Sequence, residues 1–371
     1  MFRNKPNFDK RFLTFETIAL ILVSALRNKA VGNDTYRYIL AVEWAGHSSW
    51  NETFSNFAMG YINPTNATKD PGFIILEKLI SIFTTDQIPI LFIYATLVLV
   101  PLAWFLKTTI RGQFHYAFAY ILFITLFYSN IPNQLVRQSV AFVIMLYAIH
   151  MLSNNMEKKA LTILLIASFF HKSVFAVLLL YLMYKFIKPK YYIRLALLGS
   201  VVLFTMPFLI MGLVENMSDV YSNYMTSSYY DNKQKPFMVF LLIGGLYSII
   251  AISFLQKKLD YEEYRMELAG ASLGLIFLPL IFVDPNLYRL VAYCSIWYCI
   301  LVPKAIDTFP VKRLLYFVII AIFAYKTYTA SNSYKFYWEY MELNDEYAFI
   351  DQNSKFYDTE NINYNHYLQQ C

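Results

Sequence analysis

Long apolar segments recur along nearly the whole chain, and they limit what it can fold into. A helix needs about 20 mainly apolar residues to cross a bilayer. Hydrophobic residues make up 58% of the 371 residues and charged residues only 15%, whereas soluble domains carry about 25% charged residues. The chain is therefore predicted to be an all-α integral membrane protein. Its membrane domain is expected to be one polytopic bundle over residues 1–328.

The apolar segments predict about eleven membrane spans, several of them short enough to require tilting. Their approximate ranges are 9–26, 88–106, 114–130, 135–152, 159–171, 173–187, 193–213, 237–255, 267–283, 287–303 and 313–328. The basic N-terminus precedes the first span, but no small-residue cleavage site follows that span. A retained span is therefore expected rather than a cleaved signal peptide. The polar triplet 171–173 separates two spans, because it is too polar to face lipid.

Lysine and arginine residues predict which loops face the cytoplasm, because cytoplasmic loops are enriched in both. With the N-terminus inside, the inner loops receive Arg3, Lys5, Lys10, Arg11, Lys107, Arg111, Lys158, Lys159, Lys185, Lys188, Lys190, Arg194, Lys257, Lys258, Arg265, Lys304, Lys312 and Arg313. If the apolar segment 73–83 also crossed, these clusters would face outward. It is therefore predicted as a re-entrant or interfacial helix. This topology predicts outer loops at 27–87 and 214–236 and an outer tail at 329–371.

The net charge of +6 is explained by these inner loops and not by a nucleic-acid module. The three cysteines have no metal-binding spacing, and the five histidines do not cluster. No phosphate-binding glycine loop or dinucleotide fingerprint is present in the sequence. We therefore expect no nucleic-acid partner, no metal and no cofactor.

Four polar segments fall at the predicted outer face, and the first follows the first span. Gly32, Asn33 and Asp34 favour a turn, and Asp34 or Thr35 can cap a helix that follows it. Asp34 is then either a cap or a carboxylate that positions or deprotonates a substrate hydroxyl.

The second and fourth polar segments each contain an isolated arginine, Arg137 and Arg289. Each of these arginines stands at the predicted outer end of a span, where the helix begins. An arginine at a helix N-terminus opposes the helix dipole, so a compensating anion is expected. The anion is either a substrate phosphate or the phosphate of a neighbouring lipid, reached by snorkelling. Arg289 could instead pair with nearby Asp284.

The third polar segment, His171-Lys172-Ser173, stands between two spans. A histidine at this depth can act as a general acid or base, or donate a hydrogen bond to a phosphate while neutral. A lone histidine is more often a structural residue, and both interpretations remain open here.

In this order, the polar segments resemble the EpsG family of bacterial polysaccharide polymerases, which is related to the Wzy polymerases. The matching segments are Arg27…Gly32-Asn33-Asp34-Thr35-x-x-Tyr38, Asp70-Pro71-Gly72-Phe73-x-x-Leu76, Leu135-x-Arg137-Gln138-Ser139-x-Ala141, Ala167-x-x-Phe170-His171-Lys172-Ser173, Tyr288-Arg289-Leu290…Tyr293 and Val302-Pro303. The third and fourth segments, separated by one span-loop-span unit, are the most specific pair. Asp70 stands where the family is expected to carry Glu more often.

The resemblance implies a GT-C-like membrane glycosyltransferase in the bacterial inner membrane. It would join oligosaccharide repeat units carried on undecaprenyl diphosphate, at the periplasmic or extracellular face, for O-antigen, capsule or exopolysaccharide. Its partners would be the lipid-linked donor and acceptor, membrane lipid and a possible chain-length regulator.

On this interpretation Arg137 and Arg289 bind the diphosphate, and Asp34 is the first candidate for a base, with His171 the second. Further substrate contacts are predicted for Arg27, Thr35, Asp70, Gln138, Lys172, Tyr288 and Tyr293.

Three other functions fit many spans with polar residues. A transporter or flippase of lipid-linked oligosaccharide should show structural repeats and charges near the midplane, whereas these charges gather at one face. An acyltransferase acting on polysaccharide would need its own nucleophile or histidine constellation, which cannot be assembled here. A purely structural subunit would leave the two outer arginines unexplained.

Overall fold

The computed structural model describes residues 6–32, 34–54, 70–110, 113–128, 133, 135–206, 237–282, 287–331 and 334–341. Within these ranges the regular elements are helices, accompanied by one isolated bridge between Arg27 and Phe336. The longer helices are α1 (Pro6–Ala25), α2 (Thr35–His47), α4 (Pro71–Ser81), α5 (Gln87–Thr109), α6 (Gln113–Phe123), α7 (Val136–Ser153), α8 (Glu157–Phe170), α9 (Val177–Phe186), α10 (Tyr192–Thr205), α13 (Phe237–Leu255), α14 (Arg265–Phe277), α15 (Tyr288–Ile306) and α16 (Lys312–Ser331). The shorter ones are a π-helix, η1 (Ile124–Tyr128), and the 3-10 helices η2 (Lys172–Ala176), η3 (Pro189–Tyr191) and η5 (Leu278–Phe282).

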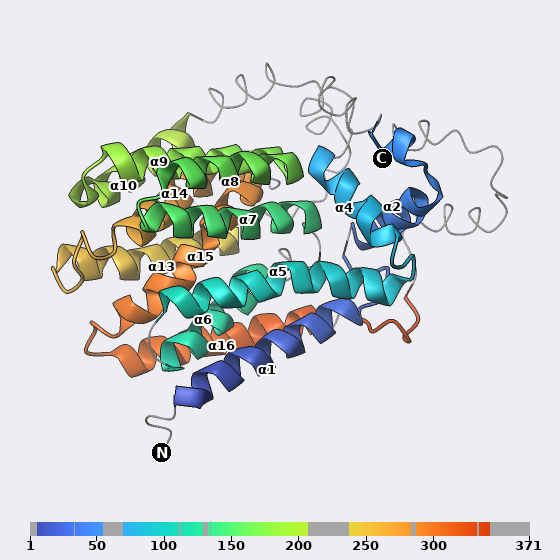
Figure 1. Ribbon diagram of the computed structural model, residues 1–371. Helices are drawn as coiled ribbons and strands as arrows, with labels where there is room; N and C mark the ends of the chain where they lie inside the picture. The colour runs from blue at the N-terminus through green and yellow to red at the C-terminus, as the bar shows by residue number, and fades with distance from the viewer. Residues whose placement is uncertain are drawn as a thin grey trace.

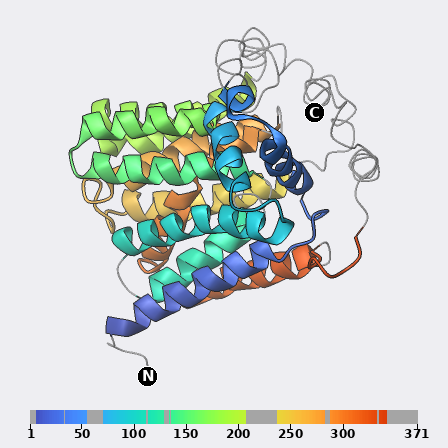
Figure 2. The same cartoon turned by 45° about the vertical axis from the view of Figure 1, so that its right-hand side comes forward.

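The long helices lie side by side in one bundle, and the short helices α2 and α4 gather at one end of it (Figure 1). The same arrangement is seen after a 45° turn (Figure 2), where the N-terminus lies at the opposite end. We call the end that carries α2 and α4 the capped end. The ends of α1 and α8 and the starts of α5, α7 and α15 lie toward it.

The bundle is that of a membrane protein. Among the described residues, four helical stretches are long and apolar enough to cross a bilayer: α5, α7, α13, and α14 with η5. Helix α15 becomes a fifth if its two halves, which meet at 55°, form one span. Several of the remaining predicted spans coincide with shorter helices, such as α8 with 14 residues and α9 with 10. Others coincide with a helix that begins in basic residues, such as α16. The prediction of about eleven spans is therefore not confirmed by length and apolarity alone.

Basic residues gather at the end of the bundle opposite the capped end. Lys107 lies in the last turn of α5, Lys158 in the first turn of α8, Lys185 in the last turn of α9 and Lys304 in the last turn of α15. The segregation matches the two sides that the sequence distinguishes, and the assignment of the basic end to the cytoplasm stays a prediction. The predicted outer loop 214–236 lies outside the described residues.

The predicted re-entrant segment forms α4, a helix of 11 residues that packs at the capped end and not among the long helices. Glycine allows it to come close to the bundle. A side chain at Gly72 would place its Cβ 3.1 Å from the backbone carbon and oxygen of Phe169, near the end of α8. This close approach brings the residue before α4, Asp70, to the junction between α8 and η2.

Candidate functional site

Asp70 connects three segments at the capped end. Its Oδ2 atom lies 3.6 Å from Nη1 of Arg137, at the start of α7. Its Oδ1 accepts a hydrogen bond of 3.3 Å from the backbone amide of Lys172, which begins η2. Burial raises the pKa of Asp70, while the Arg137 guanidinium opposes that rise. The carboxylate thus holds α4, α7 and the α8–η2 junction in one arrangement.

Arg137 is partly open to solvent despite its buried surroundings. Its side chain is 28% exposed, against 11% for its partner Asp70. The Arg137 guanidinium also lies close enough to Tyr38, a buried residue of α2, for its charge to act on the tyrosine hydroxyl. A guanidinium has five N–H donors, and a 3.6 Å ion pair is longer than a charge-assisted hydrogen bond. Donors of Arg137 therefore remain for an anionic ligand.

His171 lies between α8 and η2 with extended backbone, and its ring is bound from one side. Its Nδ1 atom accepts a hydrogen bond of 3.2 Å from the backbone amide of Ser173 and lies 2.7 Å from Ser173 Oγ. Ser173 Oγ is also hydrogen-bonded to the hydroxyl of Tyr293, on α15, at 3.1 Å. Arg137 and Arg289 lie close enough for their charges to act on His171, and both disfavour a positive charge on the ring.

Helix α15 is attached to α7 beside this histidine. The Gln138 side chain donates a hydrogen bond of 2.6 Å from Nε2 to the backbone carbonyl of Arg289. The half-buried Arg289 lies close enough for its charge to act on both His171 and Tyr293. Tyr288 donates its hydroxyl to the carbonyl of Leu126, so this contact fixes α15 against η1. Asp284, the alternative partner of Arg289, lies outside the described residues.

Arg27 forms a second cluster whose donors are used within the protein. It is 1% exposed, and its Nε donates to Thr35 Oγ1 at 3.2 Å. Its Nη1 donates to the carbonyl and hydroxyl of Ser24 and to Asn133 Oδ1, and its Nη2 donates to the Asn133 carbonyl. Burial lowers the pKa of Arg27 to about 10. This geometry supports a structural role that fixes the loop between α1 and α2.

The loop around Arg27 is held by two further segments. The Gln87 side chain donates a hydrogen bond of 2.9 Å to the Arg27 carbonyl. The backbone of residues 26–28 pairs with residues 335–337 after α16, and Asn28 Nδ2 donates to the Glu339 carbonyl at 2.7 Å. The described beginning of the predicted outer tail is thus attached to the capped end.

Asp34 and Thr35, which the sequence predicts as a helix cap or as substrate contacts, differ in their contacts at the start of α2. Asp34 occupies the N-cap position of α2, but its side chain makes no capping hydrogen bond and is half exposed. Thr35 donates to the Val31 carbonyl at 2.6 Å and accepts from Arg27, so its hydroxyl belongs to the structural cluster. Tyr38 lies close enough to both Asp34 and Arg137 for their charges to act on its hydroxyl.

The structure thus brings together most of the predicted polar residues at the capped end. The residues joined by contacts or by their charges are Tyr38, Asp70, Arg137, Gln138, His171, Lys172, Ser173, Arg289 and Tyr293. We call this set the cationic site, because it holds three cations and one carboxylate. Tyr38 and Ser173 were not predicted as site residues, although both stand inside the motif segments. Asn133 was not predicted either, and its only sequence signal is a polar residue before the start of α7.

The cationic site suits an anion better than a metal ion. Arg137, Arg289 and Lys172 supply positive charge, and the partly exposed side chains supply N–H donors of the kind that bind phosphate oxygens. In the part of the chain that the structure describes, no group of three or more histidine, cysteine or acidic residues could hold a metal.

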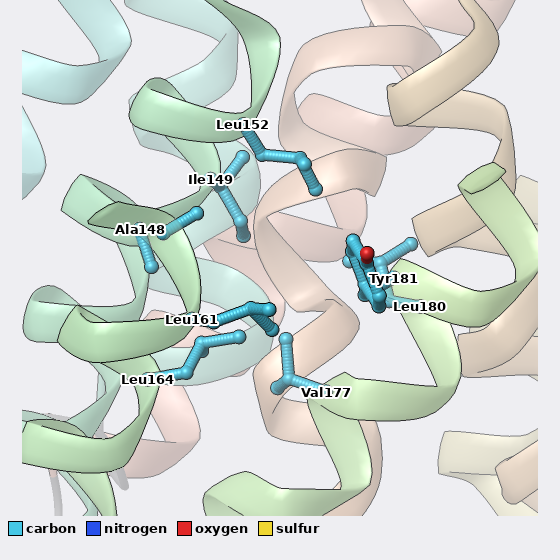
Figure 3. Close-up of a pocket in the computed structure, with 9 residues that line it drawn as sticks. Ala148, Ile149, Leu152, Leu161, Leu164, Val177, Leu180 and Tyr181 are labelled. Carbon is cyan, nitrogen blue, oxygen red and sulfur yellow. The ribbon is translucent and has the colours of Figure 1, made fainter. Parts of the chain in front are cut away.

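An apolar cleft lies between α7, α8 and α9, away from the polar residues (Figure 3). Ile149, Leu164 and Val177 line it together with Leu180 and the ring of Tyr181. Only apolar surface faces the cleft, so it offers no group for chemistry.

Comparison with known proteins supports the motif resemblance. The EpsG family model matches residues 10–342, which covers the whole cationic site and the segment that holds the first outer loop. Among curated proteins and solved structures, none matches the chain. The long match confirms the resemblance seen in the RQSxA and FHKS segments, and the chain belongs to the EpsG family.

Proposed function

We propose that this protein is a Wzy-type polysaccharide polymerase, a glycosyltransferase that joins oligosaccharide repeat units carried on undecaprenyl diphosphate. The observation that carries the proposal is the cationic site, in which Arg137, Lys172 and Arg289 gather with His171 at one end of a membrane bundle. Membership of the EpsG family supports polysaccharide synthesis as the setting. The product would be O-antigen, capsule or exopolysaccharide.

The reaction transfers the growing chain from one lipid carrier to a hydroxyl on the next lipid-linked unit. The acceptor oxygen forms a bond to the anomeric carbon, and the bond from that carbon to the diphosphate oxygen breaks. The diphosphate leaves with the electron pair, and the hydroxyl proton passes to a base, for which Asp34 is the first candidate. Negative charge grows on the leaving oxygen, so fixed cations stabilise the transition state.

Arg137 and Arg289 would form the clamp for the diphosphate. Arg137 is oriented by Asp70 and Tyr38, while Arg289 is oriented through the hydrogen bond from Gln138 to its backbone. Preorganised donors need not rearrange as charge develops, which is the advantage of holding both arginines by protein contacts. Lys172, which is exposed, adds a third positive charge.

The membrane setting completes the proposal. About eleven spans in a GT-C-like arrangement would place the basic end in the cytoplasm and the capped end on the periplasmic or extracellular face of the inner membrane. The lipid carrier would then approach from the outer leaflet. A chain-length regulator could act on the same face, where the segment after residue 333 contacts the first outer loop.

The test is an elongation assay with purified full-length protein and a lipid-linked repeat unit. The wild-type protein is expected to give a ladder of longer products, and Arg137→Ala and Arg289→Ala are expected to give none. Arg194→Ala is the matched control, because Arg194 is exposed on α10 at the basic end. If wild-type protein leaves the unit unpolymerised but moves it across a vesicle membrane, the protein is a flippase and the proposal is wrong.

A further inference from the structure

One contact of His171 involves a proton of fixed position, and this contact indicates which of the two ring nitrogens is protonated. A backbone amide can only donate, and the amide of Ser173 donates to Nδ1 at 3.2 Å. Nδ1 must therefore present a lone pair. In a neutral imidazole the single proton then resides on Nε2.

We infer that His171 acts as a neutral hydrogen-bond donor through Nε2–H to an anionic oxygen of the substrate diphosphate, and that Ser173 and Tyr293 are positioning residues for it. The inference rests on the proposed function. The inference also favours the role of hydrogen-bond donor over the role of general base, because a base must turn a lone pair toward the acceptor hydroxyl. Here the lone pair faces Ser173.

The positioning chain extends from the ring to a second helix. Ser173 Oγ lies 2.7 Å from Nδ1 and is hydrogen-bonded to the Tyr293 hydroxyl at 3.1 Å. Tyr293 is 2% exposed on α15, so the far end of the chain is fixed in the protein core. Among the described residues, Nε2 of His171 has no hydrogen-bond partner. Because the residue is only half-buried, Nε2 is available to bind a ligand.

The charges around His171 favour a donor that stays neutral. Arg137 faces it from α7 and Arg289 from α15, and both oppose a third positive charge. Lys172 is its chain neighbour, Asp70 accepts a hydrogen bond from the Lys172 amide, and Tyr293 supplies a hydroxyl from α15. An imidazolium would also turn an Nδ1–H toward the amide of Ser173, which places two donors face to face. A neutral ring between two guanidinium groups can add a donor without adding charge repulsion.

The first test measures the tautomer without any assay of activity. Full-length protein is labelled with ¹⁵N-histidine, and the His171 signals are assigned by their loss in His171→Gln. Protonated and unprotonated ring nitrogens resonate far apart, so the tautomer is read directly. We expect Nε2–H throughout pH 6 to 8, and an Nδ1–H tautomer or an imidazolium in that range would overturn the inference. Neither outcome depends on whether the protein polymerises sugars.

The second test separates a donor from a base. Glutamine places an N–H donor near the position of Nε2 but cannot accept a proton at neutral pH. If His171 is a donor, His171→Gln should elongate the lipid-linked unit about tenfold or more faster than His171→Ala, the difference made by one hydrogen bond to a charged group. Equal loss in both variants would contradict a donor role.

The third test addresses the positioning residues. Ser173→Ala and Tyr293→Phe each remove one hydroxyl from the chain and leave the backbone amide in place. Both should slow elongation at saturating substrate, with unchanged protein levels, and both should broaden or shift the His171 ¹⁵N signals. Unchanged His171 signals in both variants would show that the hydroxyls do not position the ring. Phe142→Leu, a buried neighbour of the Tyr293 ring, controls for general loss of packing.

Discussion

Asp70 and Arg137 are 67 residues apart in sequence, yet Asp70 Oδ2 lies 3.6 Å from Arg137 Nη1 at the capped end of the bundle. The pair places the carboxylate that precedes the short helix α4 against the start of the long helix α7. Asp70 also receives the amide of Lys172, next to His171. The position of one carboxylate therefore determines how two of the proposed substrate-binding segments face each other.

Asp70→Asn should lower the rate of elongation by roughly tenfold to a hundredfold, because a misplaced catalytic group can cost about two orders of magnitude. The neutral amide can still accept from Lys172 but no longer attracts Arg137. Asp70→Glu should keep much of the activity, since the charge is preserved. Elongation rates of the three proteins at equal membrane levels are the measurement. An Asp70→Asn protein as active as wild type would show that Arg137 needs no such partner.

The pH dependence of the same pair has a defined sign. Burial raises the pKa of Asp70, so its carboxylate takes up a proton at a higher pH than an exposed aspartate does. The ion pair is present above that pKa and is lost as the pH falls through it. Wild-type elongation should therefore decline on the acid side, and the profile of Asp70→Asn should lack this decline. Identical acid limbs in both proteins would assign the decline to another group.

Arg27→Ala should unfold the outer loop region instead of removing a substrate contact. The variant leaves neutral acceptors on Ser24, Thr35 and Asn133 without their buried donor, and a buried polar group left unsatisfied typically costs about 1–3 kcal/mol. The midpoint of thermal unfolding in detergent should fall clearly for Arg27→Ala and little for Arg137→Ala. A stable but inactive Arg27→Ala protein would instead support the predicted role of Arg27 in binding substrate.

Gly72→Ala should push α4 away from the end of α8. The added Cβ would lie 3.1 Å from backbone atoms of Phe169, which cannot move aside as a side chain can. Overpacking of this kind typically costs about 1–3 kcal/mol. Gly244→Ala is the matched control, because a Cβ there meets no atom within 4 Å. We expect lower thermal stability and slower elongation only in Gly72→Ala, and equal behaviour of the two variants would contradict the close approach.

The sequence was sufficient to predict that several polar residues gather at one end of the bundle, but not which of them contact each other. Arg137, His171 and Arg289 were expected at one end because the order of spans assigns each loop to a side, and the structure brings them together. Arg27 looked like another candidate cation, yet it is buried among Ser24, Thr35 and Asn133. Hydropathy distinguishes helix ends from helix centres, and it does not indicate which polar groups at one end bond to each other.

The spacing of apolar residues in the sequence does not predict what Tyr38 and Ser173 contact. Tyr38 reaches Arg137 because α2 folds over the end of the bundle, and short outer helices have no span length to reveal their placement. The interaction of Ser173 with His171 requires the extended backbone of the histidine between α8 and η2. The EpsG motif segments contain both residues, so the resemblance indicated their positions while their partners became visible only in the folded chain.

Binding of the lipid diphosphate at the cationic site is tested by the lipid-linked material in cells that produce Arg137→Ala in place of the wild-type protein. We expect a single unpolymerised repeat unit on undecaprenyl diphosphate, with the variant present in the membrane at normal levels. Arg194→Ala should give full-length polymer in the same cells. Polymer of wild-type length from Arg137→Ala would contradict the cationic site as the place where the lipid diphosphate is bound.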